Sequence, residues 1–248
     1  HTGMSAISGM GLTAEQWGDG NTVINKAYIQ TALDEVITSE VYSLIPDYAD
    51  LFDWDNQNNA EAVLEMQYSD KAKSGDWGGW NINGNFASVW LSIRNPQGDA
   101  TVFPGWSLAV PTWSLADEYE AGDPRKYVTL YDAEEELTDY NRAFMNTGYF
   151  NRKYMARADY QGSGGDPSHN FPRNFMDIRY ADVLLMAAEV WLADNPGKAA
   201  GYLSQVRTRS LGAAAAKTTI TLDDIYHERR VELGGRGLRK KDILRRGL

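Results

Sequence analysis

The chain has 248 residues, of which 43% are apolar and 23% charged, so it is long enough to bury a hydrophobic core. Its 24 basic and 34 acidic side chains give a formal net charge of −10, which disfavours nucleic acid as the main partner because phosphates would be repelled. It has no cysteine, which excludes disulfides, thiol nucleophiles and cysteine-ligated metals, and no apolar run approaches the length of a transmembrane helix.

The N-terminal part of the chain combines an aperiodic segment with a helical one. Residues 1–20 are rich in glycine and predict a loop. Residues 25–38 place apolar side chains at helical spacing and predict an amphipathic helix. Pro46 ends this helix and a short helical turn follows, so residues 25–52 form an N-terminal helical part. Residues 61–69 alternate apolar with polar side chains, which predicts a short half-buried strand.

The middle of the chain has little periodicity. Residues 70–112 are rich in tryptophan, glycine and asparagine, and long loops in compact domains usually carry function. We therefore expect residues 60–175 to be a loop-rich, ligand-binding region. Thr112 is a candidate N-cap of a short helix that ends at Gly122. Residues 134–136 are three consecutive glutamates, which predict a solvated acidic face.

The last third of the chain is predicted to be helical. Residues 180–192 and 198–210 each carry apolar side chains at helical spacing, and the Asn-Pro-Gly turn at 195–197 separates them. Two helices joined in this way form a tetratricopeptide-like hairpin. Thr221 and Asp224 have the spacing of a capping box, which opens a further helix.

These elements predict a mainly α fold. Helical hairpins of the tetratricopeptide type carry an irregular loop-rich region with a few short strands. We expect one domain over residues 1–248, with residues 176–248 as its C-terminal helical part. Small alanines suit close packing of the two hairpin helices; they are Ala187, Ala188 and Ala199.

Positive charge is concentrated at the C-terminal end. Residues 225–248 carry six arginines and two lysines against Glu228, Glu232 and Asp242. We expect these arginines to form ion pairs within the fold. Contact with an acidic partner is the alternative, and a nucleic-acid arm is disfavoured because no aromatic residues are interleaved with the basic ones.

Candidate metal and nucleophile sites are weak. His1, His169 and His227 are scattered along the chain, and residues 53–58 resemble a calcium loop without its glycine and its final glutamate. Ser163 lies in a glycine-rich segment without the signature of a nucleophile elbow. We therefore expect no metal site, no cofactor and no nucleophilic catalysis.

Two further motifs are better explained by structure than by chemistry. Glu118, Glu120 and Asp123 would serve glycoside hydrolysis only if two of them lie at the required separation, and Glu118 and Glu120 project differently from a helix. The glycine cluster at 234–237 lacks the residues of a phosphate-binding loop and predicts a bend between helices.

The aromatic residues of the middle segment are the best candidates for a binding site. Indole faces stack on the C–H face of a sugar ring, and amide and carboxylate groups hydrogen-bond its hydroxyls. Tryptophans lie in glycine-, asparagine- and proline-rich stretches of this segment, together with such polar groups. The predicted glycan-binding residues are Asp76, Trp77, Trp80, Asn81, Asn83 and Trp106. For each single tryptophan the alternative, that its indole fixes the loop to the helical core, remains open.

Motifs in the C-terminal third closely resemble the SusD/RagB family. They are "IRYADVLLMAAEVWLADNPGKAAGYLSQVRTRS" at 178–210 and "IYHERRVELGGRGLRKKDILRRG" at 225–247. The segments "YSLIPDYADLF", "EMQYS" and "PTWSLADEYEAGDPRKY" also resemble the family and occur in the family's order. Five such motifs in order are a specific signal.

This resemblance implies a function at the cell surface. SusD/RagB proteins are glycan-binding lipoproteins of the Bacteroidetes outer membrane. The expected protein is therefore not an enzyme; it captures an oligosaccharide or polysaccharide and delivers it to a SusC-like TonB-dependent transporter. The family's lipidated cysteine is missing here, so we expect membrane attachment only through a lipid anchor absent from this chain. The chain is expected to be partial, as a fragment, a processed form or a short variant. A helical-repeat scaffold without sugar binding and a glycoside hydrolase are the alternatives.

Overall fold

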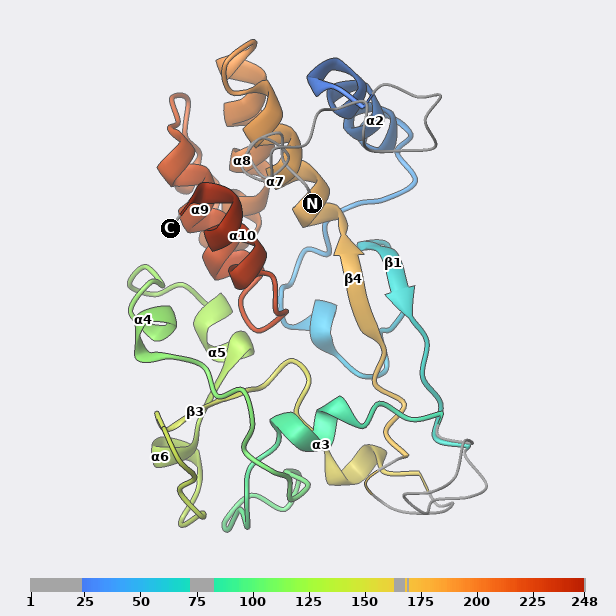
Figure 1. Cartoon of the computed structure of the whole chain (residues 1–248), viewed down its shortest axis with the longest axis vertical. Helices are drawn as coiled ribbons and strands as arrows, with labels where there is room; N and C mark the ends of the chain where they lie inside the picture. The colour runs from blue at the N-terminus through green and yellow to red at the C-terminus, as the bar shows by residue number, and fades with distance from the viewer. Residues whose placement is uncertain (1–23, 72–82, 163–167, 169, 248) are drawn as a thin grey trace. The chain divides into compact units, whose positions relative to one another are not determined.

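The computed structural model describes the chain except for residues 1–23, 72–82, 163–167, 169 and 248. Its contacts divide the chain into two compact units (Figure 1). Residues 1–46 and 179–248 form one, which we call the helical unit, and residues 47–178 form the other, which we call the loop-rich unit. The loop predicted at residues 1–20 lies outside the described residues.

The helical unit consists of five α-helices and one short 3-10 helix within its described residues. They are α2 (Lys26–Thr38), α7 (Tyr180–Trp191), α8 (Pro196–Leu211), η5 (Ala213–Ala215), α9 (Leu222–Glu232) and α10 (Arg239–Arg246). Local capping explains where three of these helices begin. The side chain of Asn25 accepts from the N–H of Tyr28, and that of Asn195 accepts from the N–H of Lys198. Thr221 opens α9 with the predicted capping box.

Helix α7 is the centre of the helical unit. It packs against α2, α8 and α9, and Figure 1 shows these helices side by side. Leu184 of α7, Leu203 of α8 and Ile225 of α9 are fully buried. The alanines that we expected between α7 and α8 are also fully buried, so the predicted hairpin is confirmed; they are Ala187, Ala188 and Ala199.

Buried ion pairs tie the C-terminal helices together, as the charge pattern predicts. Glu232 of α9 is fully buried and accepts from Arg179 at 2.8 Å and from Arg209 at 2.6 Å. Arg207 of α8 donates to Glu228 of α9 at 2.9 Å. Each of these charges is satisfied by a partner on another segment, so the pairs fix the register of the helices.

A second buried network holds α10 in place. Arg229 of α9 donates to Asp182 of α7 at 2.8 Å and to Asp242 of α10 at 3.2 Å. Arg245 also donates to Asp242, at 3.0 Å, and pairs with Glu189 of α7. The arginines at the C-terminal end are therefore used within the fold, as expected.

The loop-rich unit has short elements separated by irregular backbone. In chain order they are η2 (Asp50–Phe52), β1 (Ala62–Met66), α3 (Ala87–Leu91), α4 (Trp113–Ala116), α5 (Arg125–Thr129), β2 (Leu130–Asp132), α6 (Ala133–Glu136), β3 (Tyr149–Asn151), η3 (Ala158–Tyr160) and β4 (Phe175–Arg179). Strand β1 pairs with β4, whose last residue belongs to the helical unit. Strands β2 and β3 pair antiparallel with Tyr131 opposite Phe150. The predicted strand at 61–69 is confirmed, and the fold is mainly α with a few short strands, as expected.

Two groups of buried aromatic and aliphatic side chains form the core of this unit. The first contains Ile93, Val102, Tyr131, Ala133, Tyr140, Phe150 and Met155. The second contains Trp54, Val89, Ala156 and Phe171, with Phe86, Phe103 and Tyr160 packed against it. The segments between the short elements are therefore anchored by rings rather than by long helices or wide sheets.

One local prediction of the middle segment is corrected by the structure, and another is confirmed. Thr112 caps α4 as expected, but this helix ends at Ala116 instead of reaching Gly122. The glutamates at 134–136 lie in α6 and all three are exposed, so the predicted solvated face is confirmed; Glu134 also accepts from the Tyr140 hydroxyl and from Arg142. Tyr140 and Arg142 follow Glu134 by six and eight residues. Helical and strand periodicity do not predict contacts at these separations.

The predicted bend at 234–237 is confirmed. It separates α9 from α10, and Gly235 and Gly237 adopt φ angles of 78° and 73°. Such positive φ angles favour glycine because it has no Cβ. Over the described part of the chain, none of the helices has the length and apolarity that crossing a membrane would require.

Candidate functional site

Trp106 lies on an irregular segment that is hydrogen-bonded to α3. Its N–H donates to the carbonyl of Val89 at 3.0 Å, and the N–H of Leu108 donates to the carbonyl of Trp90 at 2.8 Å. Gly105 allows this close approach, because a Cβ there would lie 2.2 Å from the Val89 oxygen. Arg94 supports the segment from the side, since its Nε donates to the carbonyl of Trp106 at 2.9 Å. The backbone of Trp106 is therefore held in place beside α3.

Two half-exposed indoles meet around one phenylalanine. The ring of Phe86 lies 5.0 Å from that of Trp90 and 5.3 Å from that of Trp106, both edge to face. Trp90 is 42% exposed and Trp106 is 36% exposed. We call Phe86, Trp90 and Trp106 the aromatic surface. Phe86 also packs on the buried core, so the two indoles are held in place while part of each remains open to a ligand.

A cavity of about 450 Å³ adjoins Trp106, and we call it the Trp106 cavity. It is lined by Arg94, Trp106, Ser107, Leu108, Ala109, Val110, Thr112, Ala143, Phe144, Met145 and Thr147. Three of these residues have positive φ angles, 54° at Ser107, 52° at Ala109 and 59° at Met145. Such strained backbone persists where the surroundings enforce it and is frequent at ligand-binding sites. Phe144 is 92% exposed, so the cavity offers apolar surface to solvent.

The structure describes two of the six predicted site residues. Trp106 lies on the aromatic surface, and Asn83 is exposed three residues before Phe86. The carbonyl of Asn83 accepts from the N–H of Ser69 at 2.8 Å, which holds the backbone there. The other four predicted residues lie outside the described residues; they are Asp76, Trp77, Trp80 and Asn81.

Sequence reasoning left Trp90 out of the predicted site and missed three other residues. Phe86 supports both indoles, and Arg94 and Phe144 line the Trp106 cavity. The Nη groups of Arg94 make no hydrogen bond to any residue that the structure describes, so they are available to a ligand. No local pattern marks these three residues, because only the tertiary contacts bring them to Trp106.

Of the three candidate carboxylates, Asp123 is placed away from a hydrolytic arrangement. Asp123 is 2% exposed, and its two oxygens accept from the backbone and guanidinium of Arg125 at 2.8–3.1 Å. It therefore closes a structural ion pair at the start of α5 and is not accessible to a substrate.

The weak calcium-loop resemblance at residues 53–58 corresponds to a turn. The carboxylate of Asp53 accepts from the N–H of Asp55 at 3.0 Å, and the amide of Asn56 donates to the carbonyl of Asp50 at 2.9 Å. Among the residues with described positions, no three or more histidine, aspartate or glutamate side chains are grouped so that they could hold a metal ion.

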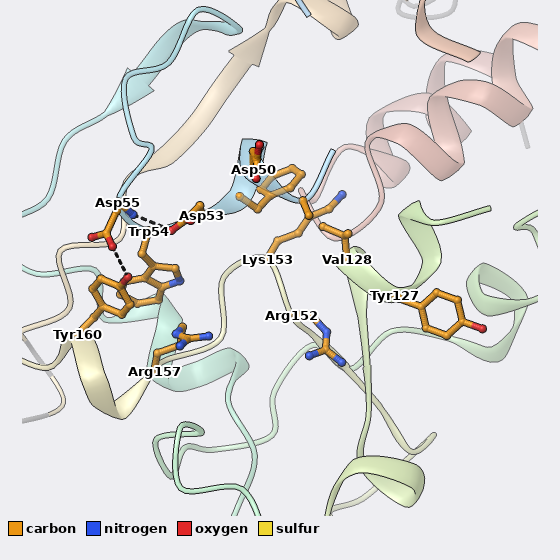
Figure 2. A pocket seen from close by; sticks show the side chains of 12 residues that line it. Asp50, Asp53, Trp54, Asp55, Tyr127, Val128, Arg152, Lys153, Arg157 and Tyr160 are labelled. Atoms are coloured by element: carbon orange, nitrogen blue, oxygen red, sulfur yellow. Dashed lines mark hydrogen bonds between the residues drawn. The ribbon is translucent and has the colours of Figure 1, made fainter. Parts of the chain in front are cut away.

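A larger cavity, of about 650 Å³, opens elsewhere on the loop-rich unit (Figure 2). Charged side chains, Trp54 and two tyrosines line it. It shares no lining residue with the Trp106 cavity. Sequence reasoning did not predict this cavity, because its walls come from three separate segments.

Helical hairpins combined with an irregular unit rich in buried rings define the class of fold. A model of the SusD family matches residues 125–247. Together with the relatives and solved structures below, this match shows that the chain is similar to the SusD family over most of its length.

Curated relatives support this similarity. The chain is 28% identical over 240 residues to a SusD-like protein of Bacteroides ovatus, an alignment that covers 90% of this chain and 41% of that protein. It is 27% identical over 247 residues to SusD-like protein P25 of Formosa agariphila, with 86% and 45% covered. The chain spans less than half the length of these relatives.

Solved structures share the fold. A laminarin binding SusD-like protein is 30% identical, with a TM-score of 0.80, and the match covers 90% of this chain and 51% of that one. Surface glycan-binding protein A from Bacteroides thetaiotaomicron, solved in complex with laminarihexaose, is 28% identical, with a TM-score of 0.78 and the same coverage. The SusD-like fold predicted from the sequence motifs is confirmed.

Proposed function

We propose that this chain is the glycan-binding part of a cell-surface protein that captures an oligosaccharide or polysaccharide. In this proposal the protein passes its glycan to a SusC-like TonB-dependent transporter and is held at the outer membrane by a lipid anchor. It binds the glycan without cleaving it. The names of its relatives support glycan binding, and the aromatic surface is the observation that carries the proposal.

The aromatic surface has the chemistry that a sugar requires. Trp90 and Trp106 offer indole area to the C–H face of a pyranose ring, and Phe86 prevents the two indoles from collapsing onto each other. The Nη groups of Arg94 can donate to sugar hydroxyls at the mouth of the Trp106 cavity. Because the backbone already holds Trp106, little conformational entropy is lost on binding.

The four predicted site residues that lie outside the described residues remain part of the proposal. Asp76, Trp77, Trp80 and Asn81 precede Asn83 in the chain by two to seven residues. We propose that these four residues add two indoles and two polar side chains to those that bind the glycan.

The first test is the substitution Trp106→Ala. We expect it to weaken binding of laminarihexaose by about tenfold or more, because a central tryptophan typically contributes about 2 kcal/mol or more to a binding site. Isothermal titration calorimetry measures the affinity, and retention in a laminarin affinity gel provides an independent readout. Tyr28→Ala is the matched control, since Tyr28 is an exposed aromatic residue of the helical unit (49% exposed). Unchanged retention of the Trp106→Ala variant together with normal folding would refute the aromatic site and favour the scaffold alternative.

Two further measurements separate the remaining parts of the proposal. Incubation with laminarin followed by an assay for reducing ends tests for turnover, and release of new reducing ends would favour the glycoside hydrolase alternative. Co-purification of the tagged protein with its SusC-like transporter from outer membranes tests delivery. Failure to co-purify would remove the transporter from the proposal and leave glycan capture intact.

A further inference from the structure

The larger cavity of the loop-rich unit is built from three segments of the chain. Residues 49–55 form one wall, residues 127–128 of α5 a second, and residues 152–160 a third (Figure 2). Its volume of about 650 Å³ lies within the range of about 300–1,000 Å³ typical of small-molecule sites.

The floor of this cavity is rigid. Phe52 and Trp54 are buried, and Lys153 is only 1% exposed. The Nζ of Lys153 donates to the Tyr48 hydroxyl at 2.7 Å and lies 4.6 Å from the centre of the Phe52 ring. Behind the floor, the guanidinium of Arg173 lies 5.5 Å from the centre of the Trp54 ring. Hydrogen bonds and cation–π contacts therefore hold the floor before any ligand arrives.

One wall presents hydrogen-bond donors. Arg157 is clamped by Asp159, which accepts from its Nε at 3.1 Å and from its Nη2 at 2.6 Å. Arg152 is clamped by Glu136 and lies 4.6 Å from the centre of the Tyr131 ring. Within the described residues, Nη1 of Arg157 and Nη1 of Arg152 have no hydrogen-bond partner. Each guanidinium is thus fixed by its ion pair while donors remain unused.

The opposite wall presents acceptors. Asp53 accepts through one oxygen from the N–H of Asp55, and Asp55 accepts through one oxygen from the Tyr160 hydroxyl at 2.7 Å. In each carboxylate the second oxygen is free of bonds to the described residues, as are both oxygens of Asp50. The hydrogen bond to Asp55 raises the pKa of Tyr160 to about 12, so this phenol stays neutral and keeps donating.

The formal charges of the side chains that line the cavity sum to zero. Arg152, Lys153 and Arg157 face three aspartates, so neither a free anion nor a free cation is favoured by net charge. A neutral ligand with neighbouring hydroxyls fits both walls, because each hydroxyl can donate to a carboxylate and accept from a guanidinium. Tyr127 also lines the cavity and is 68% exposed, so an aromatic side chain is open to solvent at its rim.

We propose that this cavity is a second saccharide-binding site, which takes one neutral sugar residue of a bound glycan. This inference rests on the proposed function for its biological setting, but its residues are separate from the aromatic surface. The two sites can therefore be tested independently.

The test uses the full chain and three neutral methyl hexosides, those of glucose, galactose and mannose. Saturation-transfer difference NMR measures their binding, because single sugars bind weakly. The double substitution Asp50→Ala/Tyr127→Ala removes one acceptor and the exposed ring, and both side chains are exposed, so folding should be kept. We expect affinity for at least one hexoside to fall by about tenfold, from a Kd of about 1 mM. Asp117→Ala/Tyr28→Ala is the matched control and should bind the hexosides as the unaltered chain does. Trp106→Ala, which alters the aromatic surface, should retain the saturation-transfer signal of the hexosides.

A charge series tests the class of ligand. The glucuronide and the glucosaminide carry one negative and one positive charge on the same ring, and both should bind less well than the neutral glucoside. The proposal is overturned by tighter binding of either charged sugar, or by hexoside binding that survives Asp50→Ala/Tyr127→Ala unchanged. If Trp106→Ala leaves laminarihexaose binding intact while Asp50→Ala/Tyr127→Ala abolishes hexoside binding, this site stands and the aromatic surface fails.

Discussion

Glu232 is the side chain whose loss should destabilise the helical unit most directly. It is fully buried and accepts from two guanidinium groups, those of Arg179 at 2.8 Å and Arg209 at 2.6 Å. The substitution Glu232→Gln keeps the shape of the side chain and removes its charge. Two cations, with side-chain exposures of 0% and 4%, would then face a neutral amide.

The size of the effect follows from the burial. Removal of one partner from a buried ion pair costs about 3–5 kcal/mol, because the remaining charge keeps its desolvation penalty. For a chain of this length, 1 kcal/mol corresponds to about 2–4 °C in Tm, so Glu232→Gln should lower Tm by about 6–20 °C. The free energy of unfolding should fall by about 3 kcal/mol or more in a urea titration followed by far-UV circular dichroism.

Glu35→Gln provides the comparison. Glu35 is an exposed glutamate of α2 in the same unit, and its substitution should change the free energy of unfolding by no more than about 0.5 kcal/mol. A loss below about 1 kcal/mol for Glu232→Gln would refute the reasoning, because it would mean that water or a rearranged partner compensates the two arginines.

Three other predictions concern a helix cap, a titration and a close backbone approach. Thr221→Ala removes the N-cap of α9 and should cost about 1 kcal/mol in a urea titration, whereas Thr221→Ser should cost less. The hydrogen bond from Lys217 lowers the pKa of Asp224 to about 2. This carboxylate therefore contributes stability that is present above its unfolded pKa of about 3.9 and is lost as the pH falls through about 2. Asp224→Asn should flatten that part of a stability–pH profile, and an unchanged slope would contradict this prediction. Gly105→Ala would place a Cβ 2.2 Å from the Val89 oxygen. We expect this clash to destabilise the protein by about 1–3 kcal/mol and to weaken its retention in a laminarin gel. A variant as stable as the unaltered chain would show that the backbone moves to accommodate the Cβ.

The helical part of the fold was readable from local patterns. Apolar spacing over 180–192 and 198–210 predicts α7 and α8 because one face of each helix must be buried against the other. The capping box at Thr221 predicts the start of α9 because its hydrogen bonds join residues only three apart. Both kinds of signal act within one or two helical turns, so the sequence contains them in full.

The loop-rich part was only partly readable. The strand at 61–69 shows alternation, but β2, β3 and β4 are short and their pairing depends on segments far away in the chain. Helices α3 and α5 have only five residues each, too few to show a helical period. Non-local hydrogen bonds and ring packing decide these elements, and neither leaves a local pattern.

The tryptophans separate what the sequence determined from what the tertiary structure decided. Composition and motifs sufficed to predict a SusD-like helical fold with aromatic residues gathered in its loops, because those features depend on residue type and short-range order. They could not distinguish Trp54 from Trp106. Trp54 packs on Tyr160 and Phe171 and is 6% exposed, whereas Trp106 touches Phe86 edge-on and is 36% exposed. Whether an indole is core or binding surface depends on which rings other segments bring to it, and only the folded chain determines that.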